Sequence, residues 1–347
     1  MTIKPDYVRW GILGCGAIAT SAIAPAIHWA HRNELLAVGS RTLERATRKA
    51  AEVGAPRAHG AYEALLADGD IDAIYIGVPN GEHARWAIAA AAAGKHVLCD
   101  KSLALTAGDA RAIREAFRAR ELVLVEGFMV RHHPQWTVVR RLLGEGVIGK
   151  VQHVRAWLRS TLDHPSDHRW SKILGGGALF DVTCYAVNAA RMAIGEEPIR
   201  TQATARWTAS GVDESTDALL EFPGGAVASV HGSLRAPFEQ GVVISGEKGR
   251  IVLERPFVTH WDPTQIVVEI TASERQVHDI GGANHFLHMF EHVAQHILDR
   301  ETPLSPAEDG VANVEACAAI LQDAQHAQDA QHAHQERSRG PSPETHS

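Results

Sequence analysis

The chain has 347 residues, more than one folding unit usually holds, so two domains are expected. Its formal net charge is -7 without any long basic run, which argues against nucleic acid or an anionic membrane as partner. The four cysteines stand far apart, no secretion signal opens the chain, and no stretch reaches the roughly 20 apolar residues of a membrane span. We therefore expect a cytoplasmic protein that acts on small molecules.

The first part of the chain alternates short apolar runs with helix-like segments, which is the rhythm of βαβ units on a parallel sheet. Alanine-rich helices are expected at residues 82–94 and 106–121. This pattern predicts an α/β domain over residues 1–128, a doubly wound parallel sheet of the Rossmann kind. Its strands are expected at residues 7–13, 34–40, 72–79, 95–101 and 121–128.

A glycine-rich turn, GCGAIA, follows the first expected strand and opens a helix. Gly14 would allow the tight turn, and Gly16 would let the backbone approach a pyrophosphate that sits on the helix N-terminus. Glycines between a strand and a helix can also serve packing alone, but this context favours a dinucleotide. The residues predicted to contact it here are Gly14, Cys15, Gly16, Ala17 and Ile18.

The residues at the end of the second expected strand indicate whether the dinucleotide is NAD or NADP. An NAD enzyme usually carries an acidic residue there, about 20 positions after the glycines. This chain has Ser40 and Arg41 instead, a hydroxyl and a guanidinium that suit a 2′-phosphate. We predict that NADP(H) is preferred over NAD(H). The alternative is that Arg41 is an ordinary charge at a helix start.

The second part of the chain changes to strands in succession, which predicts an α+β domain over residues 129–322 with a large open, mostly antiparallel sheet. Residues 323–347 begin with a crude Asp-Ala-Gln-His-Ala repeat and are expected to form a low-complexity, mobile tail. Helices are expected at residues 177–192, 284–298 and 306–322. The strands are expected at residues 151–158, 200–208, 218–222, 226–234 and 241–253, with turns at 223–225 and 246–249.

Four histidines follow helical spacing near the end of this domain: His285, His288, His292 and His296. Such spacing can make a metal site. No HExxH motif or cysteine pair accompanies them, and apolar residues alternate with them. We therefore interpret the stripe as a helix flank and expect no metal.

These features together resemble the glucose-fructose oxidoreductase, inositol dehydrogenase and rhizopine catabolism (Gfo/Idh/MocA) family over residues 8–322. Besides the glycine turn, the resemblance is carried by VPN, GKHVLCDK and GGGALFDVTCY. EGFMVRHHPQ, at residues 126–135, is similar to the branch of D-xylose dehydrogenases and dimeric dihydrodiol dehydrogenases. The resemblance implies a homodimer or homotetramer through the open sheet. It also implies cofactor contacts at Val78, Pro79, Asn80, His83, Asp100 and Lys101.

The same resemblance implies three catalytic residues. The family's Glu-Lys-Pro motif matches Asp100, Lys101 and Ser102, so the lysine is retained while serine could loosen the turn that aims it. Tyr185 matches the family's proton-transfer residue, and Asp181 lies four positions before it. A nearby Lys101 ammonium would favour the Tyr185 phenolate, and Asp181 would bind a second substrate hydroxyl. Taken singly, Asp181 and Tyr185 could be ordinary helix residues.

The function predicted from these residues is hydride transfer between NADP and a secondary or anomeric alcohol of a sugar, sugar derivative or cyclic diol. One alternative is a keto-sugar reductase that works mainly toward the alcohol. A second alternative is a catalytically silent NADP-binding regulator. The joint presence of Lys101, Asp181 and Tyr185 favours an enzyme, because a regulator has no physical need for the three.

Overall fold

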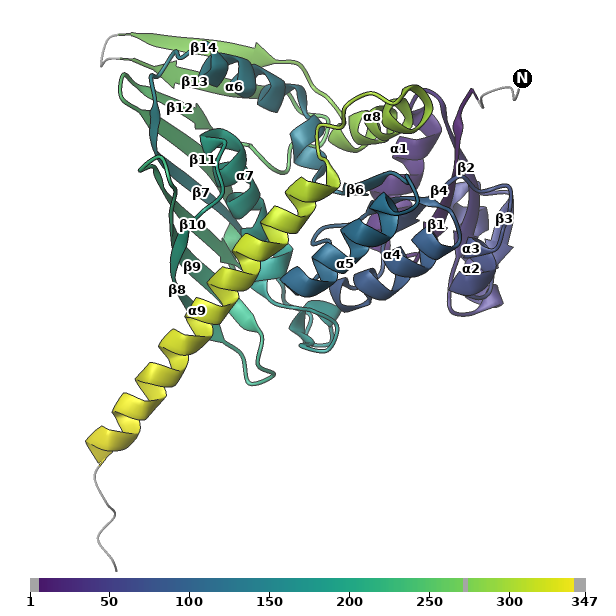
Figure 1. Ribbon diagram of the computed structural model, residues 1–347, viewed down its shortest axis with the longest axis horizontal. Coiled ribbons are helices and arrows are strands. Elements are labelled where there is room, and N and C mark those ends of the chain that lie inside the picture. The colour runs from purple at the N-terminus through teal and green to yellow at the C-terminus, as the bar shows by residue number, and fades with distance from the viewer. Residues whose placement is uncertain (1–5, 271–273, 340–347) are drawn as a thin grey trace, which may run out of the picture.

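Two β-sheets organise the protein, as the computed structural model of residues 6–270 and 274–339 shows (Figure 1). A six-stranded sheet has the order β3-β2-β1-β4-β5-β6, and an eight-stranded sheet has the order β14-β13-β12-β11-β7-β10-β9-β8. The prediction of a parallel Rossmann sheet followed by an α+β unit with a mostly antiparallel sheet is confirmed.

The first sheet is parallel throughout, and its order reverses between β1 and β4. All five expected strands are present. The extra edge strand β3 was not expected, because its sequence Arg-Ala-His contains no apolar run. The strands are β1 (Val8–Leu13), β2 (Asn33–Gly39), β3 (Arg57–His59), β4 (Ala73–Ile76), β5 (His96–Cys99) and β6 (Leu124–Glu126).

Helices connect these strands, and threonine side chains start two of them. The hydroxyl oxygen of Thr42 accepts the Arg45 N–H before α2, and that of Thr106 accepts the Asp109 N–H before α5. The helical elements are η1 (Ala19–Ile23), α1 (Ala24–Trp29), α2 (Leu43–Val53), α3 (Tyr62–Leu66), η2 (Asn80–Glu82), α4 (His83–Ala92) and α5 (Ala107–Arg118).

The second sheet is antiparallel except where β10 pairs with β7 in parallel. Exposure alternates along its strands, and α7 packs on one face. The strands β13 and β14 were not expected, because β14 is largely polar. The strands are β7 (Val151–Thr161), β8 (Arg200–Trp207), β9 (Asp213–Glu221), β10 (Val227–Ser233), β11 (Arg235–Gly246), β12 (Arg250–Leu253), β13 (Thr264–Glu269) and β14 (Arg275–Ile280).

The helices of the second part include one that is longer than expected. Helix α9 continues through Arg339 and projects past the edge of the sheet in Figure 1. The Asp323 carboxylate accepts the Ala203 N–H of β8 at 2.5 Å, and Ala324 is buried, so the repeat begins as packed helix rather than as a tail. The mobility expected for residues 340–347 lies outside the described residues. The elements are η3 (Met129–His132), α6 (Pro134–Gly144), η4 (His168–Trp170), η5 (Leu179–Thr183), α7 (Cys184–Ile194), α8 (His285–Asp299) and α9 (Ala307–Arg339).

The last two helices complete the core of the first domain. Phe290 of α8 meets the Trp10 ring of β1 edge to face, with centroids 4.9 Å apart. Val311 and Val314 of α9 belong to the apolar cluster on the opposite side of the same sheet. The described part of the chain up to Phe128 therefore has apolar surface that α8 and α9 help to cover.

The four histidines predicted to form a stripe lie on α8, the helix that packs against β1. His285 is buried, with its ring 6.2 Å from that of His133. His292 accepts the Leu304 N–H at 2.7 Å. Burial lowers the pKa of His285 to about 3 and that of His133 to about 4. In the part of the chain that the structure describes, no group of three or more histidine, cysteine or acidic side chains is placed to hold a metal ion.

The buried histidine predicts a specific loss of stability in acid. His285 is neutral in the fold but becomes protonated in the unfolded chain below about pH 6.5, so stability falls as the pH drops from 6.5 toward 3. At pH 5 this group alone should cost about 2 kcal/mol. His285→Gln should therefore reduce the difference in unfolding free energy between pH 7 and pH 5 by about that amount, measured by urea titration. The exposed His31→Gln variant is the control, and an unchanged difference in His285→Gln would contradict the assignment.

Candidate active site

A cavity of about 500 Å³ lies at the carboxyl ends of β1, β2 and β4, where the strand order reverses. Open α/β sheets bind their ligands at this place. Residues from both parts of the chain form its walls, because His168 and Leu174 approach from the loop after β7. The lining consists of Gly14, Cys15, Gly16, Ser40, Arg41, Arg45, Tyr62, Gly77, Val78, Pro79, Glu82, Trp86, His168 and Leu174.

Gly14 and Gly16 of the turn are glycine for different physical reasons. Gly14 has a φ of +94°, and a Cβ atom there would lie 2.7 Å from the Gly77 carbonyl oxygen. A Cβ atom on Gly16 would meet nothing within 4 Å. Gly14 is therefore needed by the fold itself, whereas Gly16 leaves open space beside the backbone N–H groups that start the helix. A dinucleotide phosphate fits that space.

A basic wall closes the far end of the cavity. Ser40 and Arg41 follow β2, and Arg45 lies one helical turn further on α2. The Arg45 guanidinium donates to the Cys15 carbonyl oxygen at 3.3 Å, which joins α2 to the glycine turn. Sequence reasoning missed Arg45, because no motif marks it and Arg41 lies before the start of α2.

The other residues predicted to contact the cofactor lie around this cavity but outside its lining. Ala17 and Ile18 start the helix after the turn. The Asn80 amide donates to the Gly175 carbonyl oxygen at 3.4 Å, and the Asp100 carboxylate accepts the Lys101 N–H at 2.9 Å. His83 is fully buried with both ring nitrogens 2.8 Å from backbone carbonyl oxygens. Their contact with a cofactor stays a prediction.

Lys101 and Asp181 form an ion pair between the end of β5 and η5. The Lys101 ammonium donates to Asp181 Oδ1 at 2.9 Å and to the Asp181 backbone oxygen at 2.7 Å. Arg169 donates to Asp181 Oδ2 at 3.3 Å. Burial opposes both charges, but the pairing holds the pKa of Lys101 well above and that of Asp181 below its ordinary value. Lys101 is therefore a fixed cation.

The turn that carries this lysine is buried and contacts His83. The peptide bond between Lys101 and Ser102 is cis, and Ser102 is 1% exposed. The Ser102 carbonyl oxygen lies 2.8 Å from His83 Nδ1. The loosening expected from serine in place of proline stays a prediction.

Tyr185 lies beside the lysine in an apolar setting. The Lys101 ammonium is 5.2 Å from the centre of the Tyr185 ring, and the rings of Phe128 and Phe257 pack against the same tyrosine. The hydroxyl donates to the Met129 sulfur at 3.5 Å. Burial raises the pKa of Tyr185 more than Lys101 lowers it, so the phenol is protonated at neutral pH. The net direction is opposite to the expected shift toward phenolate.

The segment with Asp181 and Tyr185 is not a uniform α-helix. Residues Leu179–Thr183 form a π-helix before α7 begins, a feature frequent at functional sites. The glycine run before it has packing reasons: a Cβ atom on Gly176 or Gly177 would lie about 2 Å from Arg169 or Asp213 atoms. Sequence reasoning missed Arg169, which no motif marks.

This site defines a class of enzyme, because one chain combines a cavity at the strand reversal, lined by a glycine turn and two arginines, with a paired lysine and a protonated tyrosine. It is the class of NAD(P)-dependent oxidoreductases that act on alcohol and carbonyl groups. The chain belongs to the Gfo/Idh/MocA family. Residues 8–128 match the oxidoreductase family with NAD-binding Rossmann fold, and residues 136–252 match the GFO/IDH/MocA C-terminal domain.

Relatives of known activity agree with the predicted branch. The D-xylose 1-dehydrogenase (NADP(+)) 2 of Haloferax volcanii is 35% identical, over 92% of this chain and 98% of that protein. The trans-1,2-dihydrobenzene-1,2-diol dehydrogenase of Bos taurus is 32% identical, over 76% of this chain and 78% of its own. A 3-ketoreductase of Actinomadura kijaniata, solved with NADP and TDP-benzene, matches 91% of this chain and 98% of its own at a TM-score of 0.86 and 29% identity.

The two glycines give a matched test of the cavity. Gly16→Ala should leave the melting temperature of the free protein unchanged, because the added methyl meets no atom. It should weaken NADP+ binding at least tenfold, because the methyl fills the space assigned to phosphate. Gly14→Ala should lower the melting temperature by itself, because its φ and the Gly77 oxygen oppose a side chain. Calorimetry measures the melting temperatures, and NADP+ titration measures the affinities. If Gly16→Ala binds NADP+ as tightly as the wild type, the assignment of the phosphate to this turn is wrong.

Proposed function

We propose that the protein is an NADP-dependent oxidoreductase acting on a secondary or anomeric alcohol of a sugar, sugar derivative or cyclic diol. The observation that carries the proposal is the Lys101 ammonium, bonded to Asp181 at 2.9 Å and held 5.2 Å from the Tyr185 ring. The D-xylose and dihydrodiol dehydrogenases among its relatives support this substrate class.

Each residue then has one task. A bound dinucleotide supplies or accepts the hydride. Arg41 and Arg45 bind its 2′-phosphate. Lys101 stabilises negative charge on the reacting oxygen, and Tyr185 exchanges a proton with that oxygen. Asp181 aligns Lys101 and accepts a hydrogen bond from a second substrate hydroxyl.

The raised pKa of Tyr185 favours one alternative, a keto-sugar reductase working mainly toward the alcohol. A protonated phenol is ready to donate to an alkoxide, whereas oxidation requires the phenolate. The relationship to a 3-ketoreductase supports the same direction. The silent regulator is disfavoured, because a buried ion pair beside a phenol is costly to keep without use in chemistry.

The enzyme assignment is tested by NADP+ reduction at 340 nm with aldoses, inositols and cyclic diols, and by NADPH oxidation with keto-sugars. Lys101→Ala should abolish activity on the accepted substrate, and Tyr185→Phe should lower kcat at least a hundredfold with little change in NADP+ affinity. Turnover by Tyr185→Phe near the wild-type rate would transfer the proton role to another group. If the wild type binds NADP+ but neither oxidises the alcohols nor reduces the keto-sugars, the result would favour the regulator.

The cofactor preference has a separate test. Arg41→Ala should raise the Kd for NADP+ at least tenfold, because a charged hydrogen bond to phosphate is lost. The Kd for NAD+ should change much less, since NAD+ lacks the 2′-phosphate. Fluorescence titration of both dinucleotides measures this. Equal affinity of the wild type for NAD+ and NADP+ would contradict the preference.

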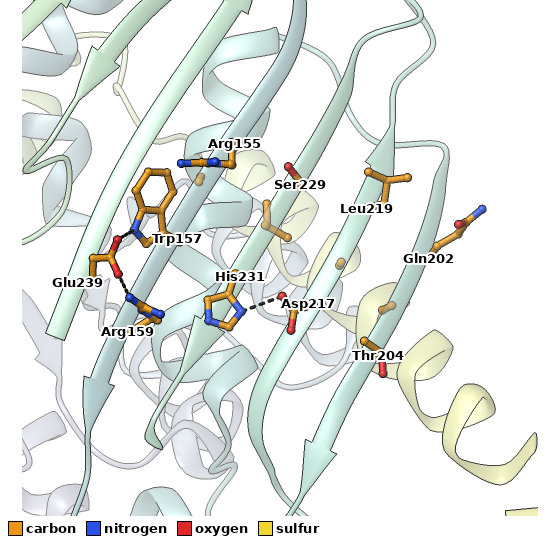
Figure 2. A pocket seen from close by; sticks show the side chains of 14 residues that line it. Arg155, Trp157, Arg159, Gln202, Thr204, Asp217, Leu219, Ser229, His231 and Glu239 are labelled. Atoms are coloured by element: carbon orange, nitrogen blue, oxygen red, sulfur yellow. Dashed lines mark hydrogen bonds and ion pairs between the residues drawn. The ribbon is translucent and has the colours of Figure 1, made fainter. Parts of the chain in front are cut away.

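We further propose that a second copy of the chain covers the open face of the large sheet, and that the protein acts in the cytoplasm. A hollow of about 640 Å³ lies on that face. There the Glu239 carboxylate accepts from the Trp157 indole and pairs with Arg159, beside the His231–Asp217 pair (Figure 2). All four cysteines are free and buried, as a reducing compartment favours. No helix within residues 6–270 and 274–339 has the length and apolar character to cross a membrane.

Sedimentation velocity tests the association. The wild type should sediment as a dimer or tetramer. Leu219→Arg should shift it toward the monomer, because Leu219 is 37% exposed within the hollow. Ile88→Arg changes a similarly exposed residue on α4 and is the control. A monomeric wild type would contradict the proposal.

A further inference from the structure

One peptide unit next to the catalytic lysine is held from both sides by buried side chains. It is the unit formed by the Ser102 carbonyl and the Leu103 N–H. His83 Nδ1 lies 2.8 Å from the Ser102 oxygen, and Glu126 Oε1 accepts the Leu103 N–H at 2.7 Å. Since the C=O and N–H of a trans peptide point in opposite directions, the two side chains clamp it between them.

The two clamping residues come from a helix and a strand. His83 starts α4 and is 0% exposed, and its other ring nitrogen lies 2.8 Å from the Val78 oxygen at the cofactor cavity. Glu126 ends β6 and is 3% exposed. Glu126 thus bonds the lysine turn to β6, and His83 packs between the Ser102 and Val78 oxygens. Burial lowers the pKa of His83, and a neutral imidazole donates to one of these two oxygens.

Glu126 sits in a place where a carboxyl group is costly. Its Oε2 atom has no hydrogen-bond partner among the described residues. A Cβ atom on Gly310 of α9 would lie 3.2 Å from Oε2 and 3.2 Å from the Leu103 side chain, so the helix backbone closes over both. Burying a carboxyl group with an unpartnered oxygen costs free energy, which points to a role for the one bond that it makes.

The charges around Glu126 belong to other pairs. Arg131 and Arg191 both bond Asp309 of α9, at 2.6 and 3.1 Å, and Arg191 also bonds Glu197. Burial raises the pKa of Glu126 to about 8, so the carboxyl is largely neutral at pH 7. A neutral carboxyl still accepts through its carbonyl oxygen, which the Leu103 bond requires.

We propose that Glu126 is a positioning residue for the reaction: by fixing the Ser102–Leu103 peptide unit against His83, it aims the Lys101 ammonium at Asp181 and at the substrate oxygen. The inference rests on the proposed function, since it assigns to Glu126 the orientation of a catalytic lysine. A displacement of about 1 Å at a catalytic group can cost a hundredfold in rate, and the lysine stands only two residues from the clamped amide.

Two variants separate the hydrogen bond from the charge. Glu126→Gln keeps an accepting oxygen of the same reach without any ionisation. Glu126→Met keeps the length and removes the acceptor. Gln135→Met is the matched control, because Gln135 is equally buried and bonds only backbone oxygens at Arg255 and Pro256 through its amide nitrogen.

The steady-state measurement uses the full-length protein and counts sites by NADP+ titration. Per bound NADP+, Glu126→Met should lose at least tenfold in kcat with an unchanged Kd for NADP+. The kcat of Glu126→Gln should stay within about threefold of the wild-type value, because the glutamine oxygen can still accept the Leu103 N–H. Gln135→Met should lose stability but no turnover per site. A Glu126→Met enzyme with wild-type kcat, or a Glu126→Gln enzyme as slow as Glu126→Met, would overturn the inference.

Hydrogen exchange followed by mass spectrometry gives a reading that needs no substrate. The segment of residues 101–105 should exchange faster in Glu126→Met, and should match the wild type in Glu126→Gln and Gln135→Met. Unchanged protection in Glu126→Met would overturn the clamp even if the substrate is unknown. Failure of the proposed function has another signature: either the wild type shows no turnover, or Lys101→Ala keeps the wild-type turnover, whatever Glu126 does.

Discussion

The ion pair between Lys101 and Asp181 is the contact on which the site depends. It joins the carboxyl end of β5 in the parallel sheet to the π-helical turn in front of α7. Both side chains are mostly buried, at 13% and 19% exposure, so each needs the other to remain charged. Removing one member of such a pair typically costs about 3–5 kcal/mol, because an isolated charge then stays in a poor solvent. This pair thereby joins the two parts of the chain.

Several supports converge on this pair. Arg169 shares the Asp181 carboxylate, and the glycine run at residues 175–177 lets its loop pack closely enough to do so. On the lysine side, the turn is held at the Asp100 carboxylate and at the clamped peptide unit. Tyr185 contributes a protonated hydroxyl from the helix that carries Asp181. A cation fixed beside a neutral phenol suits the protonation of an alkoxide and its stabilisation.

The helices that follow the second sheet in the chain pack on the first sheet. The first sheet leaves apolar faces that α8 and α9 cover, through Phe290 on one side and Val314 on the other. Gly310 of α9 also closes over Glu126, next to the lysine turn. The end of the chain thus stabilises the dinucleotide domain and shields the rear of the site from water. A protein truncated after residue 128 would lack α8 and α9, and both apolar faces of the first sheet would be exposed to water.

The sequence by itself determined the architecture and the chemical class. Alternating apolar runs predict both sheets, the spacing of Gly14 and Gly16 predicts the phosphate turn, and Lys101, Asp181 and Tyr185 are recognisable from their motifs. Short polar strands such as β3 and β14 were missed because pairing with a neighbour, not composition, makes them strands.

Only the tertiary structure decided what surrounds those residues. Arg45 and Arg169 lack a motif, and Glu126 opens the EGFMVRHHPQ motif, which assigns it no role. The three reach the site through the start of α2, the loop after β7 and the end of β6. The protonation of Tyr185 depends on burial among Phe128 and Phe257, and the helical path of residues 323–339 begins with packing on β8. Local patterns encode which groups are present. Their charges and orientations follow from neighbours distant in sequence, because burial and pairing set the energy of each ionised form.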